Sequence, residues 1–167
     1  MPKYNKKITR PMNYQELKGA IDELPIARQA FLSILFFAGC RVSEALALHS
    51  SDISCTRDTV FIQFYRLKGS KQTDPQELPR ADSLEWLCEQ DGELFSFTRR
   101  TAHRLVKKVF PDLYPHYFRM NRIVKMSEQF GDATVYNVIG ITASSIDHYR
   151  GKVDIKHVGK ALQEEIG

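Results

Sequence analysis

Five side chains spread through the sequence are of the kinds that can cleave a phosphodiester, namely Arg41, Lys68, His116, Arg119 and Tyr149. Arginine donates paired hydrogen bonds to phosphate oxygens and keeps its charge when buried, so a fixed pair can stabilise the charge that builds on those oxygens. A lysine on a turn can protonate a leaving 5′ oxygen, and a histidine can support proton transfer. A tyrosine phenolate near such cations is an adequate nucleophile. Composition alone does not single out these residues.

The bulk composition is that of an ordinary globular domain. The chain has 167 residues, of which 43% are hydrophobic and 26% charged, enough to form the core of one domain. No apolar run approaches the ~20 residues that span a bilayer, and the basic N-terminal segment lacks the apolar centre of a signal peptide. These features favour a cytoplasmic protein that does not bind membranes.

The cysteines and histidines offer no metal site. Cys40, Cys55 and Cys88 are odd in number and not spaced as C-x-x-C, so we expect reduced thiols rather than a disulfide or metal ligands. The five histidines contain no pair at ligand spacing. The sequence therefore predicts no bound metal.

Charge is unevenly distributed along the chain. The net charge is +4, with basic residues gathered in the N-terminal arm and in residues 66–71 and 98–108, and acidic residues in 82–93 and at the C-terminus. Charge runs usually mark solvated faces, but this distribution also permits an anionic partner.

The elements that must position the candidate groups begin with three helices. Asn13 is typical of a helix cap, and Pro25 opens a second, largely apolar helix that Gly39 ends. A third helix then begins beside Arg41 and runs to about residue 48. This pattern places a strong cation at the start of an apolar helix.

A stretch with strand character follows these helices. Residues 59–65 alternate β-branched and aromatic side chains, residues 77–79 form a returning strand, and the polar turn between them carries Lys68 and Lys71. Helical periodicity then resumes and includes a basic amphipathic helix that Pro111 ends. The expected fold class is mainly α with a small antiparallel β-sheet (α+β).

Three segments in a fixed order carry a resemblance to a known family. The segment A-G-C-R-V-S-E-A-L-A-L-H-S-S-D-I is similar to the T-G-x-R-[IV]-S-E-[LA]-x-x-L-x-x-x-D-[IV] signature of tyrosine recombinases, the phage-integrase family. The segment P-H-Y-F-R resembles that family's second box, H-x-x-R, and V-I-G-I-T-A-S-S-I-D-H-Y resembles its third box, which ends in the nucleophilic tyrosine. The resemblance covers the chain from Pro11 to about Lys160 and predicts the catalytic-domain fold of that family.

The resemblance implies a DNA integrase or site-specific recombinase from a virus or other mobile element, acting on DNA in the host-cell cytoplasm. In such an enzyme a tyrosine attacks a phosphate to give a 3′-phosphotyrosyl link, which a free 5′ hydroxyl later reverses. Because bond energy is conserved in this DNA recombination, the resemblance implies no metal and no nucleotide cofactor.

Individual residues take roles from the same resemblance. Arg41 and Arg119 occupy the positions of the two catalytic arginines, and His116 that of the second-box histidine. Lys68 matches the β-turn lysine, and Tyr149 matches the nucleophile.

Other residues are candidates for auxiliary roles. Glu44, three residues after the first arginine, is expected to orient it, and Lys71 is the alternative turn lysine. At Ile141 the family's His or Trp is absent, so either His148 supplies a donor or that contact is missing. Tyr136 is a rival nucleophile, which we expect to pack in a helix instead.

The departure at Ile141 leaves two other hypotheses open. One is a catalytically weak or silent DNA-binding module. The other, within the same chemistry, is a type IB topoisomerase-like nicking and resealing activity.

The expected partner is double-stranded DNA carrying an attachment site. The basic helix at residues 98–108 falls where the fold would lie against DNA, and its cations would add salt-dependent phosphate contacts. The DNA-binding candidates are Arg99, Arg100, His103, Arg104 and Lys107.

The chain is expected to be one catalytic domain, residues 1–167, without the N-terminal core-binding domain of family members. It would have a basic arm at residues 1–11 and a tail helix at residues 152–167. We expect a homo-oligomer, a tetramer, on DNA and a monomer when free in solution.

Overall fold

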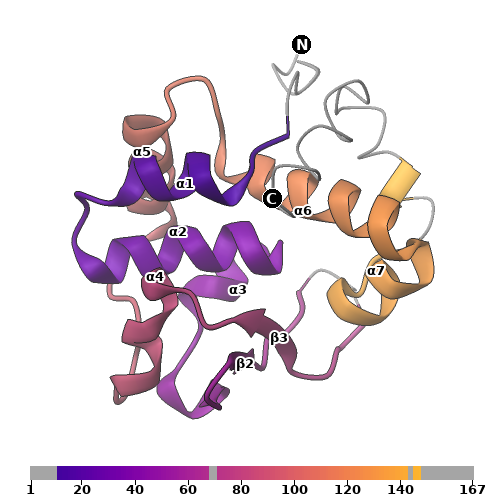
Figure 1. Ribbon diagram of the computed structural model, residues 1–167, viewed down its shortest axis with the longest axis horizontal. Coiled ribbons are helices and arrows are strands. Elements are labelled where there is room, and N and C mark those ends of the chain that lie inside the picture. The colour runs from indigo at the N-terminus through magenta and orange to yellow at the C-terminus, as the bar shows by residue number, and fades with distance from the viewer. Residues whose placement is uncertain (1–10, 68–70, 143–144, 148–167) are drawn as a thin grey trace.

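A small antiparallel sheet lies at one edge of a group of helices in the computed structural model, which describes residues 11–67, 71–142 and 145–147 (Figure 1). In chain order the elements are α1 (Tyr14–Ile21), α2 (Ile26–Ala38), α3 (Val42–Leu46), the 3₁₀ turn η2 (Ser50–Asp52), β1 (Ile53–Cys55), β2 (Thr59–Ile62), β3 (Gln76–Pro79), α4 (Asp82–Glu85), the 3₁₀ turn η3 (Trp86–Glu89), α5 (Arg99–Val109), α6 (Pro115–Phe130) and α7 (Asp132–Ile139). The expected α+β class is confirmed. The expected tail at residues 152–167, and the basic arm except Pro11, lie outside the described residues.

The apolar helix α2 is the central element of the core. Almost every side chain from Ala30 to Ala38 is buried, and α1, α3, α4, α6 and β3 all contact this helix. Gly39 ends α2 in the left-handed conformation at φ 66°, as the sequence predicts. Its Cα also lies so close to α6 that a Cβ there would be 2.9 Å from Cβ of Arg122. A bare backbone at this position therefore lets α6 approach the point where α3 begins.

The sheet has the order β1-β2-β3, with both pairs antiparallel. Val60 and Ile62 of β2 and Leu78 of β3 are buried, whereas Phe61 and Glu77 are less buried or exposed, so one face of the sheet covers the core. Sequence periodicity predicts strand over residues 59–65, but the paired strand ends at Ile62 and the chain continues without ladder pairing to Leu67.

A second, smaller apolar cluster joins α6 to α7. Ile123, Val135, Ile139, Ile141 and Ile146 are buried together in it. Ile141 is only 6% exposed, so this residue contributes packing at the position where the resembling family has a hydrogen-bonding side chain.

The expectation of three reduced cysteines is wrong for two of them. Cys55 at the end of β1 and Cys88 in η3 form a disulfide with a Cα–Cα distance of 5.9 Å, while Cys40 is a buried free thiol. The pairing depends on β1 lying beside η3, and β1 is a strand that the sequence pattern did not predict. Two cysteines separated by 33 residues gave no local spacing signal.

The described residues contain no helix that is both long and apolar enough to cross a bilayer.

Candidate active site

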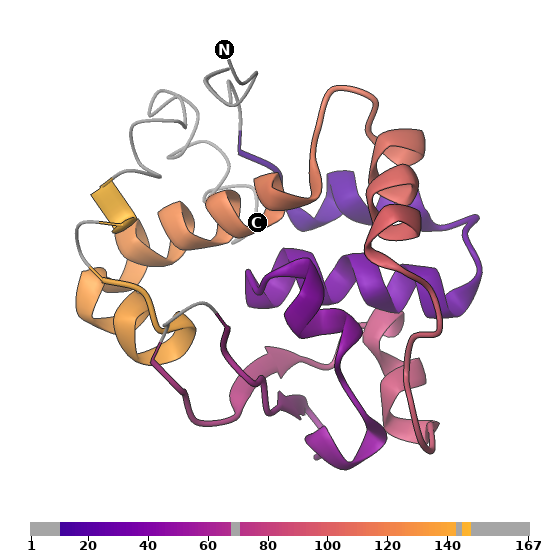
Figure 2. The same ribbon diagram turned by 180° about the vertical axis from the view of Figure 1, so that it is seen from behind.

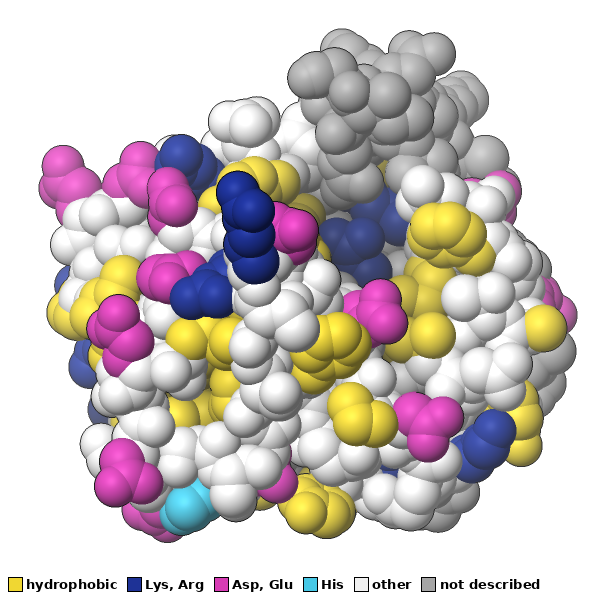
Figure 3. Space-filling view, turned by 60° about the horizontal axis from the view of Figure 1, so that its bottom comes forward, with side chains coloured by type: hydrophobic (Ala, Val, Ile, Leu, Met, Phe, Trp, Pro, Cys, Tyr) yellow, Lys and Arg dark blue, Asp and Glu magenta, His cyan; other side chains and the backbone are white. Residues whose placement is uncertain are grey.

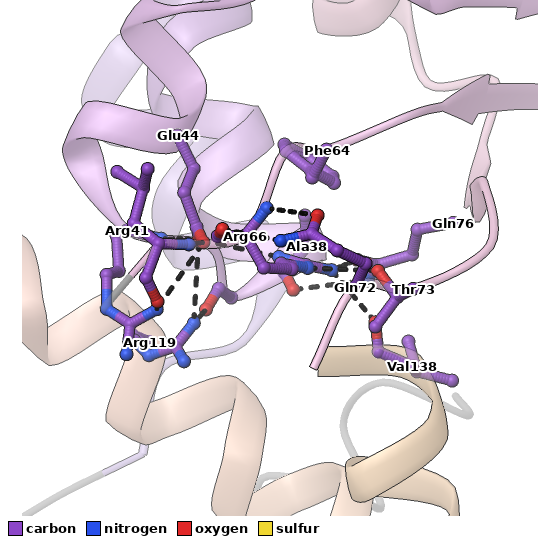
Figure 4. Close-up of polar contacts among 12 residues, drawn as sticks. Ala38, Arg41, Glu44, Phe64, Arg66, Gln72, Thr73, Gln76, Arg119 and Val138 are labelled. Atoms are coloured by element: carbon purple, nitrogen blue, oxygen red, sulfur yellow. Dashed lines mark hydrogen bonds and ion pairs between the residues drawn. The ribbon is translucent and has the colours of Figure 1, made fainter. Parts of the chain in front are cut away.

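The structure brings together three of the side chains singled out in the sequence, Arg41, Glu44 and Arg119 (Figure 4). Lys68, His148 and Tyr149 lie outside the described residues, so their positions stay predictions.

Arg41 stands at the turn between α2 and α3. Its backbone is extended, and its amide donates to Oε1 of Glu44 at 2.7 Å, which caps the first turn of α3. Its Nη1 lies 3.4 Å from Oε2 of Glu44 and donates to the carbonyl of Leu67 at 3.1 Å. The side chain remains 21% exposed, so the guanidinium is held by Glu44 and Leu67 while still reaching solvent.

Glu44 is a buried carboxylate that faces three guanidinium groups. Besides Arg41, Nη1 of Arg66 lies 3.4 Å from Oε1, and Nη1 of Arg119 lies 3.9 Å from the same oxygen. The amide of Leu67 donates to Oε2 at 3.2 Å. Three positive charges against one negative charge leave a local excess of two, in a place where water screens poorly. Such a site favours an anion.

Arg119 comes from the second turn of α6 and is only 1% exposed. Its Nη1 donates to the carbonyl of Gly39 at 2.8 Å, so the second arginine holds the turn that presents the first. One turn further along α6, Nε of Arg122 donates to the carbonyl of Phe36 at 3.0 Å. His116 lies three residues before Arg119, on the same side of α6 and exposed at the start of the helix.

Arg66 is the functional candidate that the sequence analysis did not identify. Its side chain is fully buried, and burial lowers the pKa of its guanidinium while the nearby Glu44 carboxylate raises it. A signal was present, since Val60, Ile62, Phe64 and Arg66 are all buried at intervals of two. The alternation thus continues past the end of β2 and points Arg66 inward.

Lys71 faces α7 rather than the arginine cluster. Its Nζ lies 3.3 Å from Oδ1 of Asn137 and 4.6 Å from the ring centroid of Tyr136. Tyr136 lies in a helix as expected, but its side chain is 41% exposed on the surface of α7 instead of being packed in the core. A backbone hydrogen bond also connects Lys71 to the residue that follows α7, because the amide of Lys71 donates to the carbonyl of Gly140 at 3.2 Å.

The basic helix α5 presents its cations outward, as the pattern predicts. Ala102, Leu105 and Val106 are buried, and Thr98 caps the helix by accepting from the amide of Thr101 at 3.2 Å. Of the DNA-binding candidates, Arg99, Arg100, His103 and Arg104 are exposed and Lys107 is half-buried, and Lys108 is exposed as well.

The surface around α5 differs from the sheet side of the molecule. Lys107 is held with its Nζ 4.0 Å from the ring centroid of Tyr114, in the loop that leads to α6. Figure 2 shows α3 in front of α2 and α5 in front of α1, and α3 and α5 contact each other. The face with the sheet shows scattered acidic, basic and apolar side chains with no basic stripe (Figure 3). The α5 side is therefore the better candidate for a polyanionic partner.

Among the described residues, no group of three His, Cys, Asp or Glu side chains could hold a metal ion.

Solved structures of recombinases and of an integrase domain share this fold. The XerH site-specific recombinase bound to difH substrate, in a pre-cleavage complex, matches with a TM-score of 0.66 and 20% identity over 87% of this chain and 50% of that one. XerH bound to a palindromic difH substrate, in a post-cleavage complex, matches with a TM-score of 0.69 and 19% identity over 93% and 53%. The catalytic domain of bacteriophage HP1 integrase matches with a TM-score of 0.55 and 16% identity over 93% and 94%.

These matches confirm the predicted fold, that of a tyrosine recombinase catalytic domain. The chain spans about half the length of the two XerH chains. No protein-family model matches the sequence, and no curated protein sequence does.

Proposed function

We propose that this chain is the catalytic domain of a site-specific DNA recombinase that cleaves and rejoins DNA through a phosphotyrosyl intermediate. The observation that carries the proposal is the buried Glu44 with three guanidinium groups around it, in a fold shared with XerH and HP1 integrase. A net positive cluster beneath a partly exposed arginine suits the phosphate of a DNA backbone. A virus or other mobile element is the proposed origin, with host-cell DNA as the target.

In the proposed cleavage step, the hydroxyl oxygen of Tyr149 attacks the scissile phosphorus. The phosphorus–tyrosine bond forms while the bond to the 5′ oxygen breaks, and the product is a 3′-phosphotyrosyl link with a free 5′ hydroxyl. His116 supports transfer of the phenol proton, and a turn lysine supplies the proton of the leaving oxygen. Reversal of the same step reseals the strand.

The arginines have different proposed parts. Arg41 reaches solvent and would contact the non-bridging phosphate oxygens directly. Arg119 is buried and donates to the carbonyl of Gly39, so we propose that its charge would act on the phosphate from behind Arg41. A fixed charge in a site that water screens poorly is effective at stabilising the developing charge of the transition state.

Lys68 is the proposed general acid, and Lys71 the less favoured alternative. Support comes from Lys71, whose ammonium group is engaged by Asn137 and Tyr136 of α7. A substrate with sulfur in place of the bridging 5′ oxygen separates the two, because a thiol with pKa about 8.5 leaves without being protonated. This substrate should restore cleavage to Lys68→Ala, and Lys71→Ala should cleave ordinary DNA at near the wild-type rate. Restoration of Lys71→Ala instead would reverse the assignment.

DNA binding is proposed to involve α5 together with the start of α3, since these two helices contact each other. Each phosphate contact made by a cation adds about −0.9 to the slope of log affinity against log salt concentration. On bound DNA we propose a homotetramer, as the family resemblance implies.

The central test is a covalent adduct. The protein is incubated with a library of nicked suicide duplexes whose flanks are randomised, in EDTA, and adducts are separated on a denaturing gel. We expect an adduct that disappears in Tyr149→Phe and persists in Tyr136→Phe. Arg41→Ala should abolish the adduct and leave most of the DNA affinity, because that affinity is spread over many phosphates. An adduct that needs added magnesium, or that survives Tyr149→Phe, would contradict the mechanism.

A silent DNA-binding module is the second candidate function. It is favoured by the burial of Ile141, which leaves no donor at that position of the third box. Sequence-selective binding without an adduct would establish this function instead. Relaxation of supercoiled DNA without exchange of strands would indicate the topoisomerase-like activity.

A further inference from the structure

Arg66 joins three segments that are far apart in the sequence. Its Nη1 lies 3.4 Å from Oε1 of Glu44 in α3, and its Nη2 donates to the carbonyl of Val138 near the end of α7 at 2.8 Å. On the returning arm of the hairpin, its Nε donates to Oγ1 of Thr73 at 3.0 Å and its Nη2 lies 3.3 Å from Oε1 of Gln76. A single side chain thus contacts α3, the hairpin and α7 (Figure 4).

The backbone around Arg66 is fixed as well. Oε1 of Gln72 accepts from the amide of Arg66 at 2.9 Å, and Nε2 of Gln72 donates to its carbonyl at 2.8 Å. The next residue, Leu67, donates its amide to Glu44 and accepts from the Arg41 side chain. The two ends of the lysine turn are therefore held together beside the start of α3.

The end of α7 is tied to the same turn. Lys71 donates its amide to the carbonyl of Gly140, and a Cβ on Gly140 would lie 2.5 Å from the carbonyl oxygen of Lys71. Val138, the partner of Arg66, lies two residues before Gly140. Each segment that Arg66 contacts therefore adjoins one part of the proposed site: the first arginine, the lysine turn or the start of the third box.

We propose that Arg66 is a positioning residue that holds these three segments in fixed register. It does not touch DNA, because its side chain has no exposed surface, and it acts through Glu44, Thr73 and Val138. The planar guanidinium is needed because its N–H groups point in several directions. The single ammonium group of a lysine could not donate hydrogen bonds to α3, the hairpin and α7 at once. The kinetic consequence of this proposal depends on the recombinase function proposed above, but the structural consequence does not.

Two variants and a control test the kinetic consequence. Arg66→Met removes all the contacts of the fork, and Thr73→Val removes one acceptor at nearly constant volume. Ser33→Ala is the control. It deletes a buried hydroxyl whose oxygen lies 2.6 Å from Oγ of Ser83, and this hydrogen bond is not part of the proposed site. At saturating DNA we expect the single-turnover cleavage rate to fall about a hundredfold in Arg66→Met, as for a small displacement of reacting groups. Thr73→Val should show a smaller fall, and Ser33→Ala none.

DNA affinity separates positioning from direct contact and from unfolding. We expect all three folded variants to bind the same duplex as tightly as the parent protein. A cleavage rate that stays at the parent value in folded Arg66→Met, or in Thr73→Val if the first variant does not fold, would overturn the proposal. A loss that appears only as weaker binding would also overturn it.

Amide hydrogen exchange gives a readout that does not need catalysis. Loss of the Arg66 fork should raise the exchange rates of the Leu67 and Lys71 amides together, although neither amide bonds to Arg66. In Thr73→Val the same pair should rise by less, and in Ser33→Ala they should not change. If the parent protein forms no adduct, the recombinase function fails while these rates still decide the positioning role. Unchanged rates at both amides in Thr73→Val and Arg66→Met would refute it.

Discussion

Replacing Glu44 by glutamine keeps the size of the side chain and removes a negative charge that faces Arg41, Arg66 and Arg119. Oε1 accepts from the Arg41 amide and lies 3.4 Å from Nη1 of Arg66, while Oε2 accepts from the Leu67 amide and lies 3.4 Å from Nη1 of Arg41. Whichever oxygen becomes an amide nitrogen, two donors lose their acceptor.

The size of the effect follows from those contacts. A lost hydrogen bond to a charged group costs about 1.5–3 kcal/mol, and breaking a buried ion pair on one side costs about 3–5 kcal/mol. We therefore expect Glu44→Gln to lower the free energy of unfolding by about 4 kcal/mol, out of the roughly 5–15 kcal/mol typical of a domain. At this chain length the melting temperature should fall by about 12 °C.

Urea unfolding, followed by circular dichroism, measures this loss. Glu77→Gln on the exposed side of β3 is the matched control, and it should change stability by less than about 0.5 kcal/mol. Sulfate should recover part of the loss in Glu44→Gln, because an anion that binds the uncompensated guanidinium groups stabilises the folded state. A loss below about 1 kcal/mol would show that the carboxylate does not hold the cluster together.

Two further predictions concern single positions. Burial raises the pKa of the Cys40 thiol from 9.0 to about 12, so the folded state retains a proton that the unfolded chain releases above pH 9. Stability should therefore fall as pH rises from 9.0 towards 12, by up to about 1.4 kcal/mol per pH unit, and equal slopes in the parent protein and Cys40→Ala would contradict this. Gly140→Ala should destabilise by about 2 kcal/mol or more, since φ is 88° and the new Cβ would lie 2.5 Å from the Lys71 carbonyl oxygen. Gly92→Ala, at φ 79° with nothing within 4 Å, should cost less in the same unfolding assay, and equal costs would show that the contact with Lys71 is unimportant.

Local signals in the sequence predicted much of the scaffold. Helix caps and stops such as Asn13 and Gly39 act within a few residues, so their positions were recognisable and are confirmed. The placement of Arg41 beside Glu44 also follows from a three-residue spacing within one helical turn.

Contacts between distant segments could not be predicted in the same way. Arg66 depends on Val138, which is 72 residues away, and no periodicity in either segment indicates the other. Ile141 could be recognised as a departure, but only the apolar cluster of α6 and α7 explains why an isoleucine suits that position. The roles of Lys68, His148 and Tyr149 stay predictions, because these residues lie outside the described ranges.

The Cys55–Cys88 bond makes the chain between these residues a covalent ring, which contains β2, the lysine turn, β3 and α4. A protease that cuts the lysine turn would therefore release no fragment, and the cut would appear on a gel only after reduction. Because the disulfide tethers the two halves of the cut chain, the two arms of the hairpin could pair again within one molecule. Their effective concentration would be higher than that of two separate chains. Protease footprinting of the turn with and without DNA must accordingly be read under reducing conditions.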